Sequence, residues 1–193
     1  MAYNLKDVFF LGATHEFAAG TYGSAGIEGN IPIDISGYVD PIARNKKKGQ
    51  GLAVYKVHCQ VAGDVTGNPQ ISTDAGQAVL GLTVKPYAVS GDNSSALESN
   101  DMTPESDLLI WGGYYTSPAT AVPGQGSGLL PEVFCEPSAE VPYVCVRDTI
   151  FHCIETSVGM SGSDSYFVSY RIECAMIELN QSTVNQLLRT QTA

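Results

Sequence analysis

The sequence predicts an all-β fold, an antiparallel eight-stranded β-sandwich with long loops and a short C-terminal helix. The clearest observation is a pair of long apolar runs, 141–156 and 165–179, on either side of a Gly- and Ser-rich loop at 157–163. This pattern indicates a β-hairpin, and strands this apolar must lie in the centre of a sheet. Further apolar segments follow one another without alternating helical patterns, which favours a sandwich or barrel. Long crossing connections favour a single jelly roll over an immunoglobulin sandwich.

The first half of the chain contains two segments with the alternation of a half-buried strand. Residues 1–30 are expected to be an N-terminal extension and loop, because 12–30 are rich in Gly and Ala. The segment 31–35 alternates apolar with other residues and has proline near its start, where a strand tolerates it. The segment 52–61 is the next predicted strand. Its inward face is predicted to hold Ala53, Tyr55, Val57, Cys59 and Val61, and its outward face Lys56, His58 and Gln60.

The middle of the chain contains two more strands and two long connections. In residues 77–89 one face is predicted to hold Ala78, Leu80, Leu82 and Val84, and the other Val79, Gly81, Thr83 and Lys85. Residues 108–115 are apolar on both faces and include the only tryptophan, Trp111. The connections 90–107 and 116–142 exceed ordinary hairpin lengths, and long loops in compact domains usually form functional surfaces. We therefore expect these loops to carry contacts.

The end of the chain predicts a last strand and a short helix. The apolar positions change parity after Met176, which suggests a β-bulge or the end of the strand. Ser182 or Thr183 could cap a helix. Such a short helix is marginal alone and needs a surface to dock on. The predicted organisation is one domain, 1–193, with a sandwich core at 31–180 and a helical tail at 181–193, whose apolar positions are Val184, Leu187 and Leu188.

The charge balance argues against a nucleic-acid-binding protein. Twenty acidic residues outnumber ten basic ones, which gives a net charge of −10. Affinity for polyphosphate comes from Lys and Arg that displace counterions, so direct nucleic-acid binding is not expected. Charged residues make up only 16% of the chain, against about 25% in ordinary soluble domains. An assembly that hides subunit surface would explain this value. Four of the ten basic residues form one patch, Arg44, Lys46, Lys47 and Lys48.

The five cysteines indicate folding in a reducing compartment. Their spacing fits neither a disulfide framework nor a CxxC metal pair. Most lie in apolar strand segments, where a free thiol behaves as a small hydrophobic residue. The N-terminus lacks the long apolar region of a signal peptide. We therefore expect reduced cysteines and synthesis in a cytoplasm.

No pattern points to catalysis, a cofactor or a metal. The nearest match to a nucleophile elbow, Gly159 to Gly162, falls in a turn rather than between a strand and a helix. His58 and His152 each stand beside a cysteine and could be neighbours across a sheet. Calcium binding by the acidic loop stays open, because hard cations prefer carboxylate oxygens. The acids of that loop are Asp92, Glu98, Asp101, Glu105 and Asp107. The chain is not expected to be an enzyme.

Two stretches together resemble a known class of protein. The sequence IPIDISGYVDP followed by KKKGQGLAVYKVH, and the C-terminal SYFVSYRIECAMIEL, are similar to the first and last long strands of single jelly-roll major capsid proteins of icosahedral viruses. The resemblance implies a self-assembling shell subunit of the virion, made in the host cytoplasm, with copies of itself and other capsid proteins as partners. This chain lacks a basic internal arm, which suits a shell over a lipid layer or over other proteins.

On this hypothesis, loops and tail supply the subunit contacts. The expected contact loops are 12–30, 90–107 and 116–142, and the C-terminal helix would dock on a neighbour. Weak contacts suffice because closed symmetric assembly multiplies them. The candidate interface residues are Arg44, Lys46, Lys47, Lys48, Val184, Leu187 and Leu188.

Two other functions remain open from the sequence. One is a carbohydrate- or receptor-binding module of a fibre, spike or tail, with Trp111, Tyr114 and Tyr115 as the stacking platform. Core packing is the competing interpretation of Trp111. The other is a cupin-like enzyme, which would hold a metal.

Overall fold

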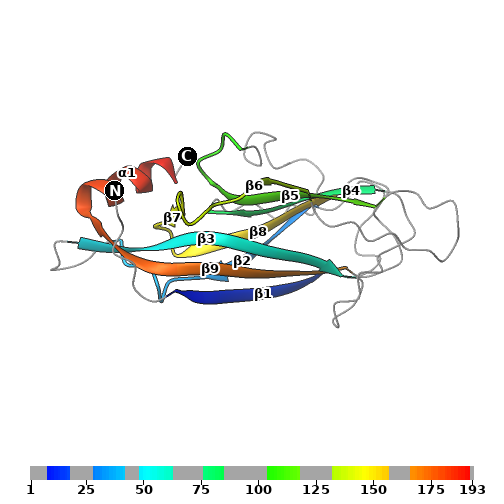
Figure 1. The fold of residues 1–193 in the computed structure, drawn as a ribbon, viewed down its shortest axis with the longest axis horizontal. Coiled ribbons are helices and arrows are strands. Elements are labelled where there is room, and N and C mark those ends of the chain that lie inside the picture. Colours follow the sequence, from blue (N-terminus) through cyan, green and yellow to red (C-terminus); the bar gives the residue numbers. More distant parts are fainter. Residues whose placement is uncertain are drawn as a thin grey trace, which may run out of the picture.

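The computed structural model describes residues 8–17, 28–41, 48–62, 76–84, 104–117, 132–156 and 166–191. Within these residues the chain forms two antiparallel sheets that pack against each other, with one helix near the C-terminus (Figure 1). The predicted all-β sandwich is confirmed. Its elements are β1 (Phe9–Phe17), β2 (Glu28–Asp34), β3 (Lys48–Ala62), β4 (Gly76–Thr83), β5 (Leu109–Ser117), β6 (Glu132–Cys135), β7 (Tyr143–Cys145), β8 (Thr149–Thr156), β9 (Tyr166–Asn180) and α1 (Gln181–Thr190).

The strand order makes the sandwich a jelly roll. One sheet has the order β1-β9-β3-β7, and the other has the order β2-β8-β4-β5-β6. Without the short edge strand β6, the eight remaining strands, renumbered in chain order, read 1-8-3-6 and 2-7-4-5. This is the arrangement of two Greek keys folded into a double-sheet jelly roll. The described residues thus hold the eight expected strands plus β6, which adds to the edge of the second sheet.

The two apolar runs of the last quarter do not form the predicted hairpin. β8 lies between β2 and β4, whereas β9 lies between β1 and β3 in the other sheet. The first run is itself divided, because β7 belongs to the sheet of β9. Both long strands are central, as their apolar length predicted. Composition indicates burial, but two buried strands joined by a loop can face each other across a sandwich as well as pair within one sheet.

A bulge divides β3 into two halves that differ in orientation. The register against β9 shifts between Val54 and Lys56, which leaves Tyr55 as an extra residue. The predicted inward face is therefore wrong for Ala53 and Tyr55, which pack in a separate cluster on the outer side of the sheet. It is confirmed beyond the bulge, where Cys59 packs on the core and His58 is exposed. The core-facing residues of β3 are Leu52, Val54, Val57, Cys59 and Val61.

The predicted bulge or strand end after Met176 is also wrong, because β9 continues to Asn180 without a register shift of its own. The change in apolar parity has a different cause. The first part of β9 faces the core between the sheets, and the last part buries its outer face beneath α1. The core-facing residues are Val168, Tyr170, Ile172 and Cys174, and the helix-facing residues are Ala175, Ile177 and Leu179.

Residues 9–17 and 28–30 belong to strands of the sandwich, contrary to the expected extension and loop. β1 pairs with β9 along its whole length, from Phe9 opposite Cys174 to Phe17 opposite Tyr166. The sandwich therefore begins at Phe9 rather than at residue 31. Gly12 and Ala13 in the middle of β1 weakened its strand signal.

Candidate assembly surfaces

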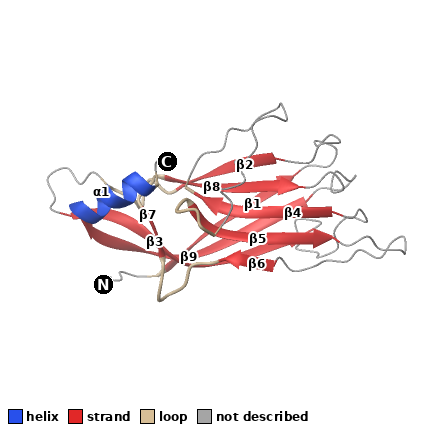
Figure 2. Ribbon diagram, turned by 90° about the horizontal axis from the view of Figure 1, so that it is seen from above, coloured by secondary structure: helices blue, strands red, loops and turns tan. Residues whose placement is uncertain are grey.

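The helix α1 covers one end of the outer face of the β1-β9-β3-β7 sheet (Figure 2). Val184 is fully buried there, and Leu187 and Leu188 are partly buried. A side-chain carbon at Gly49 would lie 3.0 Å from Val184 Cγ2, so the glycine permits this close approach. We call this group the helix cluster. Besides Val184 its buried members are Ala53, Tyr55, Val144, Val146, Ala175, Ile177 and Leu179.

The helix cluster shows that the C-terminal helix docks on its own chain. The sequence offered no local partner for the helix, and docking on a neighbouring subunit was expected. Val184 instead packs on its own chain, while Leu187 and Leu188 keep some exposed surface. Removing the tail would therefore expose the helix cluster and destabilise the subunit itself.

Gln191, directly after α1, closes the free edge of β7. Its Nε2 donates to the Val144 carbonyl oxygen at 2.7 Å, and its Oε1 accepts from the Val146 backbone N–H at 3.1 Å. Arg147 Nε donates to the Gln191 carbonyl oxygen at 2.9 Å. Gln191 is only 3% exposed, so these bonds lie away from water. The side-chain amide makes the two hydrogen bonds that an adjoining strand would make.

The N-cap lies two residues before Ser182 and three before Thr183, the two predicted caps. Asn180 is the N-cap, with extended backbone angles, and its Oδ1 accepts from the Thr183 backbone N–H at 2.8 Å. Ser182 and Thr183 lie inside the first turn. Asparagine is as good an N-cap as serine, so the choice was set by where β9 ends.

Only one residue of the predicted basic patch lies among the described residues. Lys48 starts β3, and its Nζ lies 3.1 Å from Glu178 Oε2 on β9. Both side chains are well exposed, which limits the energy of the pair. Arg44, Lys46 and Lys47 lie outside the described residues. An interface role for the patch stays a prediction.

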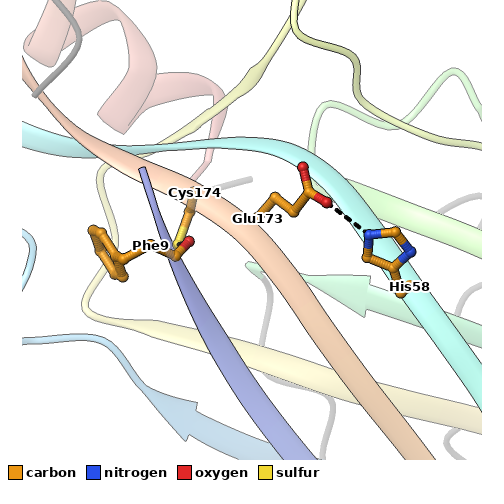
Figure 3. Close-up of polar contacts among 4 residues, drawn as sticks. All are labelled: Phe9, His58, Glu173 and Cys174. Carbon is orange, nitrogen blue, oxygen red and sulfur yellow. Dashed lines mark hydrogen bonds and ion pairs between the residues drawn. The ribbon is translucent and has the colours of Figure 1, made fainter. Parts of the chain in front are cut away.

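Beyond α1 the outer face of the β1-β9-β3-β7 sheet carries polar pairs. Glu173 and Cys174 point to opposite sides of β9 (Figure 3). Glu173 Oε1 lies 2.8 Å from His58 Nε2 on β3, whereas Cys174 Sγ donates to the Phe9 carbonyl oxygen on β1 at 3.6 Å. The two faces of β9 thus link it to both of its neighbours.

The charged residues of the two apolar runs, Arg147, Asp148, Arg171 and Glu173, have separate partners, because the long strands of the runs belong to different sheets. Arg171 lies over the ring of Phe10 at 3.9 Å, a cation–π contact on the outer face. Glu173 faces His58, Arg147 contacts Gln191, and the Asp148 side chain accepts from the Thr149 hydroxyl.

The outer face of the second sheet carries an aromatic pair. The Tyr114 ring lies 4.8 Å from the Phe134 ring, and Tyr114 is 47% exposed. The Phe134 ring lies directly above Gly112, where any side-chain carbon would collide with it. The other two residues of the predicted stacking platform, Trp111 and Tyr115, are buried in the core. The core interpretation of Trp111 is confirmed.

The histidine near His152 is His15, not His58. His152 on β8 is buried, and its ring lies 5.1 Å from the His15 ring and 4.5 Å from the Tyr170 ring. Burial, and to a smaller extent the neighbouring His15, lowers the pKa of His152 to about 3. Since His58 lies on the outer face of the other sheet, the predicted pairing of His58 with His152 is wrong. His152 is uncharged at neutral pH.

The five cysteines are free thiols, as the sequence predicted. Burial raises the pKa of Cys59, Cys145, Cys153 and Cys174 to about 12. Burial also raises the pKa of Cys135. The thiolate is the reactive form, so these side chains act as packing groups at neutral pH.

The acidic loop lies mostly outside the described residues. Of its five acids only Glu105 and Asp107 are described, and both are exposed. In the part of the chain that the structure describes, no three potential metal-ligating side chains come together. Among the same residues, no helix has the length and apolar content needed to cross a membrane.

Several solved structures are similar to this chain. Merkel cell polyomavirus VP1 in complex with GD1a oligosaccharide has a TM-score of 0.49 at 8% identity, over 93% of this chain and 99% of that chain. VP1 of trichodysplasia spinulosa-associated polyomavirus in complex with GM1 oligosaccharide has a TM-score of 0.46 at 8% identity, over 92% and 97%. Human polyomavirus 12 VP1 in complex with 3'-sialyllactosamine has a TM-score of 0.43 at 9% identity, over 90% and 100%. No protein-family model and no curated protein sequence matches this chain.

Proposed function

We propose that this chain is a structural shell subunit, a viral capsid protein that self-assembles through surfaces of its jelly roll. The observation that carries the proposal is a set of large apolar side chains exposed around a packed sandwich. Covering such side chains with other subunits stabilises an assembly by about 25 cal/mol per Å² of apolar surface. They are Val8 at 57%, Phe10 at 50%, Tyr114 at 47%, Val133 at 44% and Val141 at 75% exposure.

These side chains fall in three separate places. Val8 and Phe10 belong to the β1 edge, Tyr114 and Val133 to the β5–β6 edge of the other sheet, and Val141 to the segment before β7. A closed shell needs each subunit to contact several neighbours. Three separate apolar sites on a rigid sandwich meet that need, and the low content of charged residues agrees with it.

The net charge of the chain indicates which other partners the shell would contact. With a net charge of −10, the inner surface of the shell would face other shell proteins or a lipid layer rather than nucleic acid. Assembly places the chain in the virion, after synthesis in the host cytoplasm, where its five free cysteines stay reduced.

The test is the assembly state of the purified chain. Sedimentation velocity should show oligomers whose population rises with concentration, and negative-stain electron microscopy should show particles. Val141→Asp should weaken assembly without lowering subunit stability, because Val141 is 75% exposed. Ala139→Asp, which places the same charge at an exposed position of the same segment, is the matched control. A chain that stays monomeric at high concentration would refute the proposal.

A second candidate function is carbohydrate binding, supported by the exposed Tyr114 ring beside Phe134. Aromatic rings on a surface can stack on the apolar face of a sugar. A glycan array tests this candidate. Binding lost in Tyr114→Ala would support it, and an array without hits would dismiss it.

A further inference from the structure

The four edge strands of the sandwich differ in how they are protected against further pairing. Exposed edges are normally short, interrupted by proline or a bulge, charged with lysine, or covered. β7 has three residues and is closed by Gln191. β6 has four residues and a register shift against β5. β2 contains the exposed Pro32. Three of the four edges therefore resist the addition of another strand.

Within the residues that the structure describes, β1 has none of these features. Its nine residues, FFLGATHEF, contain no proline and no lysine, and its pairing with β9 is continuous. Among the described elements β1 is the last strand of its sheet, and Figure 1 shows it along the border of the sandwich. Its core-facing residues Phe9 and Leu11 are only partly buried. The same holds for Ile31 and Ile33 on β2, so the apolar core is incompletely covered along this side.

We propose that β1 pairs with β1 of a second copy of this chain, antiparallel and around a two-fold axis at Gly12. In this register the two pairs next to the axis each place a large side chain opposite a small one, Phe10 opposite Thr14 of the copy and Leu11 opposite Ala13, and Phe9 lies opposite His15. The one charged residue of the strand, Glu16, lies opposite Val8, so no like charges meet. The contact joins the β1-β9-β3-β7 sheets of the two copies into one continuous sheet.

A second copy fits this edge better than an unrelated strand. A two-fold contact uses the same surface twice and must be self-complementary, which the size pattern about Gly12 provides. Two identical edges also match in length. The inference rests on the proposed function, since it names one contact of the assembling subunit.

A single cysteine at the axis tests the register. In antiparallel pairs, directly opposed Cα atoms are about 4.5–5.5 Å apart, within the range that a disulfide bridges. Gly12→Cys should therefore form a reducible dimer under mild oxidation, seen on a non-reducing gel. A side-chain carbon at Gly12 meets only the Tyr170 carbonyl oxygen, at 3.6 Å, so the variant should fold.

Thr14→Cys is the matched control on the same exposed face of β1. Two copies of residue 14 would be about 13 Å apart along the strands, too far for a disulfide. The dimer yield should be several-fold higher for Gly12→Cys than for Thr14→Cys and for the parent chain. A second arm mixes Val8→Cys chains with Glu16→Cys chains, which should cross-link to each other and not to themselves.

The outcomes separate this contact from the proposed function. If the parent forms particles but Gly12→Cys and the Val8/Glu16 mixture cross-link no more than Thr14→Cys, the β1 contact is wrong and the shell function stands. Equal cross-linking at all positions would mean random collision and would also overturn the contact. A strictly monomeric parent would overturn both.

Discussion

The two edge strands of the β1-β9-β3-β7 sheet differ in how their outward backbone groups are paired. At β7 the chain closes the edge itself, because Gln191 supplies a donor and an acceptor to Val144 and Val146. At β1 nine residues form an edge with no proline, lysine or register shift, and no described element lies beyond it. One edge is thus completed within the subunit. We infer that the other is completed by assembly.

The difference follows from the path of the chain. After β9 the helix crosses the outer face of β3 toward β7, where the helix cluster holds it. That path brings residue 191 to the β7 edge, whereas β1 lies at the opposite edge of the sheet, with β3 and β9 in between. A side-chain amide can replace a missing strand only where the backbone is held this firmly. The comparison yields four predictions, from the largest effect to the smallest.

A charge in the helix cluster should have the largest effect. Val184→Asp would bury an unpaired carboxylate at a fully buried position, which should cost about 3–5 kcal/mol of unfolding free energy. Urea denaturation measures the loss. Gln186→Asp on the exposed side of α1 should change stability by less than about 0.5 kcal/mol. Thr14→Asp on the open edge loses only the exposed contact with Ser169 and some strand propensity, and should cost about 1 kcal/mol. A similar loss at Thr14 would mean that the two edges do not differ.

Removing the amide that closes β7 should come next. Gln191→Ala leaves the Val144 carbonyl and the Val146 N–H without their partner, and each buried unpaired group costs about 1–3 kcal/mol. Thermal unfolding should show the loss, while the exposed Gln186→Ala should show almost none. Unchanged stability in Gln191→Ala would mean that the edge needs no closing.

Acidification should destabilise the region around β1 at a higher pH than the region around β7. The pKa of His152 is lowered to about 3, so the folded protein binds a proton less readily than the unfolded chain does. Above about pH 6.5 the difference in pKa costs no stability, because His152 is neutral in both states. As the pH falls toward 3 the unfolded chain binds the proton first, so the unfolding free energy falls by up to about 1.4 kcal/mol per pH unit.

His152→Gln should flatten this acid dependence, measured by urea denaturation between pH 7 and 4. His15, which contacts His152, lies on β1, so amides of β1 should exchange earlier than those of β7 on acidification. An unchanged pH dependence in the variant would assign the acid sensitivity to other groups.

The smallest effect is expected at Lys48. Its pair with Glu178 is exposed, and such pairs contribute about 0–1 kcal/mol. Lys48→Met should therefore match Lys56→Met, an exposed lysine on the same strand, in denaturation experiments. A loss as large as that of Gln191→Ala would show that this exposed pair contributes as much to stability as the buried amide does.

The sequence predicted elements whose side chains alternate clearly. Apolar spacing predicted a half-buried strand at 31–35, the inward face of the second half of β3 and the central position of β9. The first of these is β2, which runs from Glu28 to Asp34. Strand partners could not be predicted, because an apolar run shows burial but not which sheet it joins. The parity change after Met176 has two physical causes, a bulge or a covering helix, and spacing alone does not separate them.

The candidate assembly surfaces were harder to predict from the sequence than the strands. Gln191 carries no apolar signal, and its role depends on where β7 lies in space. β1 was missed because Gly12 and Ala13 lower its strand propensity, although the same small residues make its edge self-complementary. Tyr114 could be named from its aromatic character, but its exposure, unlike the burial of Tyr115, depends on which face of β5 turns toward the core.

Hydrogen exchange of assembled and dissociated protein compares the two edges most directly. Amides of β7 should be equally protected in both states, since the subunit itself closes that edge. The edge-facing amides of β1, within Phe9 to Phe17, should exchange freely in the separated subunit and become protected in the particle. Equal protection of β1 in both states would contradict the claim that one end of this sheet is left for another copy to complete.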